Sequence, residues 1–185
     1  LLYHKQNPLH AGIKAPELRQ KLFKGMDQAC ADALIHVLRQ EGKLRKIADS
    51  YALPEFTVTL TKRQRGIRDK VMKIYTASGI ETPITEHILE QFPTNERTDF
   101  KQVLESLISN GELVLLTPQI CLHRDTYTVI AEAAKKHFQT NDSLTLAQLR
   151  DMLNTSRKYA QALVEYFDKI HITKKDGDAH YLDRG

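Results

Sequence analysis

Two apolar stripes at helical spacing, separated by three turn-forming residues, constrain the fold of this chain more than any other feature. The first stripe runs through Leu146, Leu149 and Leu153, and the second runs through Ala160, Leu163, Tyr166, Phe167 and Ile170. Asn154, Thr155 and Ser156 lie between the stripes, and their short polar side chains readily bond nearby backbone N–H groups. The spacing therefore predicts two short helices joined by a tight turn.

A hairpin is predicted directly after these helices. Two short runs, Ile172–Lys175 and Ala179–Leu182, flank the dipeptide Asp176-Gly177, which is typical of a tight turn between strands. A helix, a turn, a second helix and a hairpin in this order make a winged helix, which is built on the helix-turn-helix plan.

The same order of elements recurs three times along the 185 residues. The short helices are predicted at 15–22, 85–92 and 146–153, the longer ones at 26–41, 99–110 and 155–169, and a further helix opens each copy at 1–6, 61–77 and 124–138. The strand pairs are predicted at 42–47 with 52–56, 111–116 with 119–123, and 171–174 with 179–182. We therefore predict a mainly α fold with small β-hairpins (α+β), organised as three tandem winged-helix domains at 1–60, 61–123 and 124–185.

The ends of the longer helices differ between the copies. Gly42 and Gly111 stand where a left-handed residue closes a helix in the first two copies. Ile170 takes that place in the third copy, so its helix must stop in another way.

Composition argues against several classes of function. The net charge of +4 and the sequence pI near 9.0 permit a polyanion partner without requiring one. No apolar run approaches the ~18 residues of a membrane span, no glycine-rich phosphate loop or nucleophile motif occurs, and the eight histidines form no metal-binding pair. From these missing patterns we expect no catalysis, cofactor or membrane association of the chain's own. Because the chain begins with Leu1 rather than Met, we also expect a piece of a longer protein.

The two cysteines, Cys30 and Cys121, both fall in apolar stretches, one helical and one strand-like. They form no CxxC motif and no cluster with histidine. We therefore expect two buried, reduced thiols in a cytoplasmic protein.

Cations gather where the second helix of the last unit begins. That helix opens with a serine, two cations and an aromatic residue, which are Ser156, Arg157, Lys158 and Tyr159. Because a helix N-terminus already carries the positive end of the dipole, cations there are unfavourable unless an anion binds, which favours contact with phosphate. The alternatives are a solvated cation pair balanced by Asp151 or Glu165, and a Tyr159 ring that simply packs in the core.

The hairpin adds Lys174 and Lys175 beside its turn. Lysines on an edge strand can serve only to prevent strand pairing. Their position next to the element that carries Arg157 favours nucleic-acid binding instead.

The densest basic run lies at 62–73 and contains Lys62, Arg63, Arg65, Arg68, Lys70 and Lys73. On a helix these cations surround a buried face of Ile67, Val71, Ile74 and Tyr75. Such a helix can line an RNA surface, but a solvated linker helix is the commoner explanation.

A specific pattern runs through the last unit: Leu149–Ala160, then Leu163, Glu165–Asp168 and the hairpin Thr173–Asp178. These residues closely resemble the last winged helix of the bacterial selenocysteine-specific elongation factor family, SelB. Tyr3–Ile13 is similar to the opening of an earlier winged helix in the same family, whereas the middle unit resembles it only in pattern.

The resemblance implies a translational GTPase that carries selenocysteinyl-tRNA, followed by four winged helices, of which this chain would hold the second, third and fourth. It implies that the last unit binds an mRNA stem-loop, the selenocysteine insertion element beside a UGA codon, while ribosome and tRNA are reached only through the full-length factor. The positions that match the family's RNA contacts are Arg157, with Lys158 beside it, and the wing residues Lys174, Lys175, Gly177 and Tyr181. Together with Ser156 and Tyr159 at the helix start, they are the predicted RNA-binding residues.

Two other classes of function remain open from the sequence. A DNA-binding regulator with winged helices would insert a helix into the major groove and would act as a dimer on a palindromic site. No dimerisation helix is evident, so we expect a monomer. A protein scaffold would show little salt dependence of polyanion binding, whereas RNA binding through phosphates falls steeply with salt.

Overall fold

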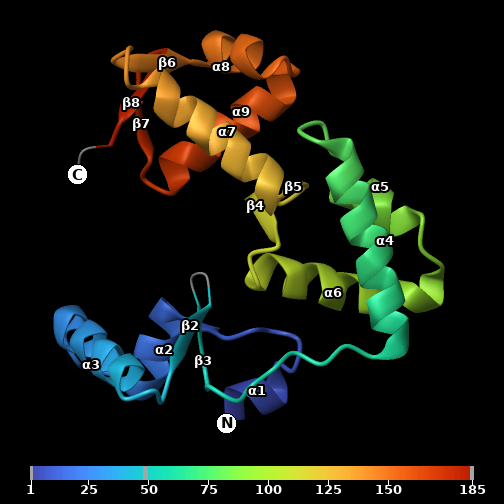
Figure 1. Ribbon diagram of the computed structural model, residues 1–185, viewed down its shortest axis with the longest axis vertical. Coiled ribbons are helices and arrows are strands. Elements are labelled where there is room, and N and C mark those ends of the chain that lie inside the picture. The colour runs from blue at the N-terminus through green and yellow to red at the C-terminus, as the bar shows by residue number, and fades with distance from the viewer. Residues whose placement is uncertain (1, 48–49, 184–185) are drawn as a thin grey trace. The chain divides into compact units, whose positions relative to one another are not determined.

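The computed structural model describes residues 2–47 and 50–183, which form two compact units (Figure 1). The first unit comprises residues 1–68 and 95–112, and the second comprises 69–94 and 113–185. Helix α4 (Lys62–Ser78) runs from the first into the second, and the short 3-10 helix η1 (Thr94–Glu96) lies where the chain returns. This division follows contact density and does not decide the predicted domain boundaries at 61 and 124, which remain predictions.

The first unit holds the first predicted winged helix and the third helix of the middle one. Its elements are α1 (Leu2–Gln6), β1 (Ile13–Lys14), α2 (Ala15–Leu22), α3 (Gln28–Gln40), β2 (Arg45–Ile47), β3 (Ser50–Ala52), the start of α4, and α6 (Arg97–Ser109). Ile13, Leu18 and Ile35 form its small core, with Tyr3, Phe23, Leu44 and Tyr51 packed around them. The opening helix agrees with the prediction except for Leu1, which lies outside the described residues.

The second unit holds the last predicted winged helix and the remaining parts of the middle one. Its elements are α5 (Thr85–Glu90), β4 (Leu113–Thr117), β5 (Ile120–His123), α7 (Arg124–His137), β6 (Ser143–Thr145), α8 (Leu146–Leu153), α9 (Arg157–Lys169), β7 (Thr173–Asp176) and β8 (Ala179–Leu182). The fold is therefore mainly helical with small antiparallel sheets, as predicted.

Each sheet is antiparallel, and two of the three sheets contain a strand that the sequence did not predict. The strand orders are β1-β3-β2, β4-β5 and β6-β8-β7. β1 and β6 each stand directly before the short helix of their unit and pair with the last strand of the hairpin. With two and three residues, they are too short to give an alternating apolar pattern.

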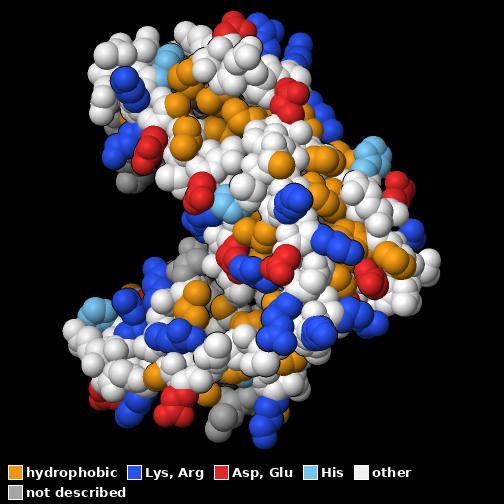
Figure 2. Space-filling model, turned by 45° about the vertical axis from the view of Figure 1, so that its right-hand side comes forward, with side chains coloured by type: hydrophobic (Ala, Val, Ile, Leu, Met, Phe, Trp, Pro, Cys, Tyr) orange, Lys and Arg blue, Asp and Glu red, His pale blue; other side chains and the backbone are white. Residues whose placement is uncertain are grey.

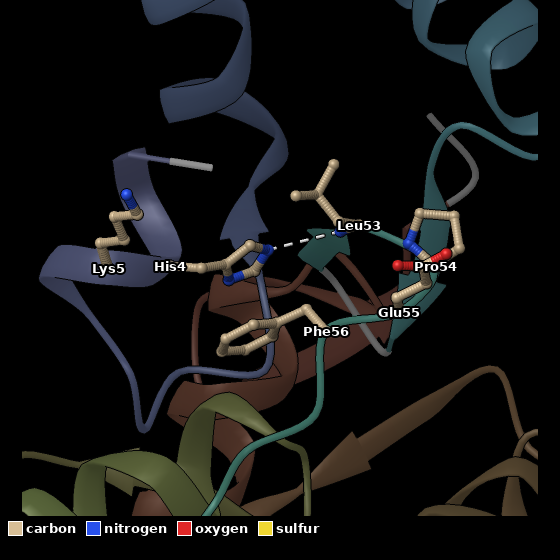
Figure 3. Close-up of a pocket in the computed structure, with 6 residues that line it drawn as sticks. All are labelled: His4, Lys5, Leu53, Pro54, Glu55 and Phe56. Carbon is tan, nitrogen blue, oxygen red and sulfur yellow. Dashed lines mark hydrogen bonds between the residues drawn. The ribbon is translucent and has the colours of Figure 1, made fainter.

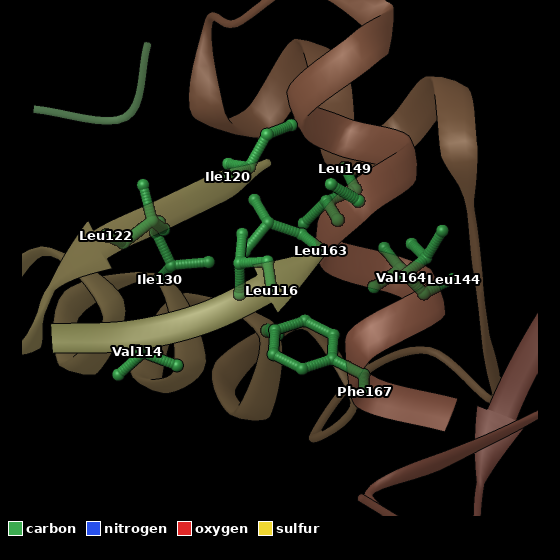
Figure 4. Packing of buried hydrophobic residues seen from close by; sticks show 12 residues of the cluster. Val114, Leu116, Ile120, Leu122, Ile130, Leu144, Leu149, Leu163, Val164 and Phe167 are labelled. Carbon is green, nitrogen blue, oxygen red and sulfur yellow. The ribbon is translucent and has the colours of Figure 1, made fainter. Parts of the chain in front are cut away.

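One hydrophobic cluster dominates the second unit and crosses residue 124, the predicted boundary. Hairpin β4–β5 contributes Val114, Leu116, Ile120 and Leu122, and helices α7, α8 and α9 contribute Ile130, Leu149, Leu163 and Phe167, among others (Figure 4). The predicted wing of the middle winged helix thus shares its core with the last winged helix.

The three longer helices end in the same Schellman turn. The left-handed residue is Gly42 (φ 69°) after α3, Gly111 (φ 73°) after α6 and His171 (φ 58°) after α9. The N–H of the next residue bonds back to the carbonyl five positions earlier, as in Ile172 N–H to the Phe167 carbonyl at 2.9 Å. The prediction that the third helix stops in another way is therefore wrong: it stops by the same geometry, with His171 in place of a glycine.

Two predictions about the first unit are wrong. Cys30 is exposed on α3, because the buried face of this helix is made by Ala31 and Ile35. Cys121, by contrast, is buried as predicted. The second strand lies at Ser50–Ala52 and not at 52–56, because β3 pairs with β2 through Ala52 opposite Arg45 and the chain leaves the sheet at Pro54.

A cavity of about 470 Å³ lies beside this sheet, lined by His4, Lys5 and residues 53–56 (Figure 3). The His4 ring stacks on Phe56 with 3.6 Å between ring centroids, and its Nε2 accepts a hydrogen bond from the Leu53 N–H at 3.3 Å. Burial lowers the pKa of His4, so the ring is neutral at neutral pH.

The turn after α9 yields a stability prediction. His171→Gly should raise the free energy of unfolding by about 0.5–1 kcal/mol, because glycine avoids the left-handed penalty but loses more entropy on folding. Gly42→Ala, at a position with open space around a new Cβ, should lower it by a similar amount. Native-state hydrogen exchange of the α9 and α3 amides measures both. A destabilising His171→Gly would mean that the 3.3 Å contact of His171 with Asp183 outweighs the backbone strain.

Candidate nucleic-acid interface

The predicted break before α9 is a second left-handed turn. Helix α8 begins in a capping box in which Thr145 and Gln148 bond each other's backbone N–H, and it ends at Asn154 with φ 47°. The Thr155 N–H returns to the Arg150 carbonyl at 3.1 Å, which closes the helix. Asparagine tolerates this conformation well, so the turn that sets the direction of α9 is encoded locally.

Arg157 lies in the first turn of α9, exposed, and lines a groove of about 580 Å³. The groove runs between the start of α8, one face of α9 and the β7–β8 hairpin. Its lining includes Thr145, Leu146, Ala147, Arg150, Arg157, Gln161, Val164, Glu165, Asp168, Lys175, Asp178 and His180. The structure thus brings Arg157 and Lys175, predicted from separate elements, onto one concave surface.

The acids proposed as partners of Arg157 are engaged elsewhere. Asp151 accepts from the Arg150 Nε at 2.8 Å, and Glu165 accepts from the Gln161 amide at 2.9 Å. Within residues 2–47 and 50–183 no ion pair forms at Arg157 or Lys175. Figure 2 shows both signs of charge interspersed on the visible face of the molecule. The groove lining is mixed as well, because it holds the acids Glu165, Asp168 and Asp178 beside the cations Arg150, Arg157 and Lys175.

The predicted wing residues lie on two different faces of the hairpin. Lys175 pairs with His180 across the sheet and faces the groove, whereas Lys174 pairs with Tyr181. Successive residues of a strand point to opposite sides, so Lys174 and Tyr181 face away from the groove. Gly177 occupies the turn at φ 59° and shapes the tip of the hairpin.

A buried polar cluster fixes the hairpin to α9. The Asp168 carboxylate accepts a hydrogen bond from the Thr173 hydroxyl at 2.6 Å and lies 2.9 Å from the His180 Nδ1. Thr173 is 2% exposed and His180 is 5% exposed, so both depend on this carboxylate for a partner. Asp168 therefore sets the position of Lys175 relative to Arg157.

The start of α9 already holds an anion. Glu81, in the segment between α4 and α5, accepts hydrogen bonds at one oxygen from the Ser156 N–H at 2.7 Å and from the Thr155 hydroxyl at 3.0 Å. The Ser156 backbone bond and then the Thr155 bond hold the pKa of Glu81 below its ordinary value, so the group is an anion at neutral pH. Glu81 therefore offsets the unfavourable interaction between the cations at this helix start and the positive end of the helix dipole. These cations do not by themselves require an external phosphate.

Tyr159 supports α9 from the side opposite the groove. Its ring packs against the core cluster, and its hydroxyl donates to the Thr82 carbonyl at 2.5 Å. Burial, with a smaller contribution from Glu81, raises its pKa. Lys158 is exposed, with its Nζ 5.3 Å from the centre of the Tyr159 ring. Tyr159 thus has a packing role, and its contribution to RNA contact stays a prediction.

Several residues that shape this site were not predicted. Asp168 and His180 gave no signal, because their pairing depends on the register of the hairpin against α9. Glu81 lies 75 positions before Ser156, and local patterns do not report such a contact. The sequence did carry one indication of a distant partner: the first turn of α9 contains no Asp or Glu of its own.

The basic helix α4 is largely a structural element. Gln64, Ile67, Val71 and Tyr75 make its buried face. Two of its cations form ion pairs, Arg63 with Asp99 and Arg68 with Glu112, and the Lys70 Nζ lies 5.9 Å from the centre of the Phe92 ring. These contacts favour the linker-helix interpretation.

The described residues hold neither a metal centre nor a membrane span. Across the described part of the chain, no group of three or more His, Cys, Asp or Glu side chains is placed to hold a metal ion. None of the described helices combines the length and apolarity needed to cross a bilayer.

Known proteins give a consistent comparison. Family models described as elongation factor SelB, winged helix, match residues 2–50 and 136–182, together just over half of the chain. The models are named for the second and third SelB winged helices, so counting the last unit as the fourth stays a prediction.

Curated relatives extend the match to nearly the whole chain. The chain is 27% identical over 180 residues to the selenocysteine-specific elongation factor of Desulfomicrobium baculatum, and 24% identical over 180 residues to that of Escherichia coli K12. Each match covers 97% of this chain, but only 28% of the Desulfomicrobium protein and 29% of the Escherichia protein. The chain therefore spans a little over a quarter of their length.

A solved structure shares the fold. It is described as the mRNA-binding domain of elongation factor SelB from E. coli in complex with SECIS RNA. The TM-score is 0.53 at 21% identity, and the match covers 67% of this chain and 99% of that chain.

The polar cluster under the hairpin is open to test. Asp168→Ala should destabilise the β7–β8 hairpin by about 1–3 kcal/mol, because it leaves the Thr173 hydroxyl and the His180 ring buried without an acceptor. Asp168→Asn should cost less, since one acceptor oxygen remains. Hydrogen exchange of the β7 and β8 amides reports the change, with Asp178→Ala as a control at an exposed carboxylate of the same hairpin. Unchanged protection in Asp168→Ala would show that the hairpin is held by the backbone ladder alone.

Proposed function

Because this chain belongs to the SelB family of selenocysteine-specific elongation factors, we propose that its last winged helix binds an mRNA stem-loop, the selenocysteine insertion element. The observation that carries this proposal is the placement of Arg157, unpaired among the described residues, on the same groove as Lys175. The binding of SECIS RNA by the E. coli relative of the same fold supports it.

The geometry suits RNA better than duplex DNA. An A-form helix has a major groove too narrow for a protein helix, so a protein contacts the loop, unstacked bases and backbone of a hairpin instead. A concave surface with two cations from different elements fits a bent backbone, whereas a DNA-reading winged helix needs a recognition helix that projects into the major groove. The relatives are translation factors, which also argues against the DNA-binding regulator.

The wider role follows from the family. The chain would bring the full-length factor to a UGA codon that is followed by the stem-loop, while GTP hydrolysis and contact with selenocysteinyl-tRNA and the ribosome would belong to other parts of that factor. In this proposal the present chain is a cytoplasmic monomer without catalysis or a cofactor of its own, and the first two winged helices act as a spacer.

Removal of Arg157 tests the proposal directly. Arg157→Ala should weaken stem-loop binding by about 1–3 kcal/mol, because it removes a charge-assisted contact. Affinity for a labelled hairpin at fixed salt is the measurement. The control is Lys169→Ala, which removes the same charge from the exposed far end of α9. If the Arg157 variant binds as tightly as the unmodified chain, the groove is not the RNA-binding surface.

Variants of Lys174 and Lys175, which are adjacent in the hairpin, test which of its two faces contacts RNA. Lys175→Ala should weaken stem-loop binding by about 1 kcal/mol or more, whereas Lys174→Ala should have less effect because its side chain points away from the groove. Both substitutions remove one charge from adjacent exposed positions, so each is the control for the other. A larger loss for Lys174→Ala would place the RNA on the outer face, beside Tyr181.

A further inference from the structure

The segment between α4 and α5 is fixed to the body of the second unit by Thr82. This residue is fully buried, and its hydroxyl donates to the Cys121 carbonyl in β5 at 2.8 Å. Its own carbonyl accepts from the Tyr159 hydroxyl. The neighbouring Glu81 is therefore presented to α9 from a rigid base, although its side chain is exposed.

Glu81 takes the place of a side-chain cap at α9. The N-cap residue Ser156 makes no capping bond with its own hydroxyl, and its backbone N–H is directed to the Glu81 carboxylate. A carboxylate bonded to the N–H of the N-cap residue lies where a phosphate bound at the helix start would also be drawn. This terminus is thus filled by a charge that comes from elsewhere in the chain.

The contact leaves the groove open. Along α9, Arg157, Gln161 and Val164 line the groove, whereas Tyr159 and Leu163 pack on the other side of the helix. Glu81 contacts the N-terminal end of α9, next to Tyr159. RNA can therefore reach Arg157 without displacing Glu81, but a phosphate at the helix terminus would meet a fixed negative charge.

We propose that Glu81 is a positioning and specificity residue for RNA binding: its carboxylate closes the start of α9 to phosphates and directs RNA to the groove at Arg157 and Lys175. This inference rests on the proposed function. A helix terminus binds any phosphate, whereas the groove requires a shaped backbone. By filling the terminus, Glu81 suppresses contact with unstructured RNA more than contact with a stem-loop.

The test compares Glu81→Ala and Glu81→Gln with the unmodified 185-residue chain. Binding of a labelled stem-loop and of an unstructured single-stranded RNA of equal length is titrated over a range of salt. For Glu81→Ala we expect about tenfold tighter binding of unstructured RNA, as one charge-assisted contact is gained. We also expect the log–log salt dependence to steepen by about 0.7 for one added phosphate, and discrimination between the two RNAs to fall. Glu81→Gln should act in the same direction but more weakly, because its amide oxygen still caps the helix.

Controls distinguish a failure of the proposed role of Glu81 from a failure of the proposed stem-loop binding. Glu86→Ala removes the same charge from exposed α5 and should leave discrimination unchanged. Hydrogen exchange of the α9 amides reports whether a variant has loosened the helix. If the unmodified chain does not prefer the stem-loop, the proposed function fails. If it does, and both Glu81 variants keep its salt dependence and its discrimination, the role of Glu81 is overturned while the proposed function stands.

Discussion

The backbone groups at the two ends of α9 must find partners, and much of the last winged helix follows from how they do so. The first N–H groups of a helix and its last carbonyls have no partner within the helix. At the start of α9 the Ser156 N–H bonds to Glu81, and at its end the Phe167 carbonyl accepts from Ile172 after a left-handed His171. The first contact ties the helix to the segment after α4, and the second directs the chain into the hairpin. Both contacts thus fix the helix that forms one wall of the groove.

Elements that follow local rules could be predicted from the sequence. Turn-forming residues at 154–156, glycines at 42 and 111, and Asp176-Gly177 placed the helix breaks and the last hairpin correctly. The repeat then extended the pattern over the chain. Among the strands, what failed was set by pairing: β1 and β6 exist only because a neighbouring strand offers them partners, and the second strand of the first sheet follows the register of Ala52 opposite Arg45. The exposure of Cys30 failed for another reason, because the apolar stretch around it did not fix which face of α3 is buried.

The candidate site shows the same division. Arg157 and Lys175 were predicted as cations on adjacent elements, and the structure places both on one groove. The strand alternation that sends Lys174 and Tyr181 to the other face needs the register of β7 against β8, which the sequence pattern alone did not supply. The cations at the start of α9 favour an external anion when only the sequence is considered, but the chain carries its own in Glu81. An unfavourable local charge can thus be balanced by a residue far away in the sequence.

The cluster shared by β4–β5 and the three helices after it has a consequence for how such arrays can be divided. The predicted sequence repeat ends near residue 123, but the buried cluster of the last winged helix already includes hairpin residues from Val114 onward. A duplication or a cut made at the sequence repeat would separate Val114, Leu116, Ile120 and Leu122 from the side chains that cover them. The side chains of the β4–β5 hairpin thus belong to the same water-excluding core as the last winged helix, whichever boundary the sequence repeat suggests.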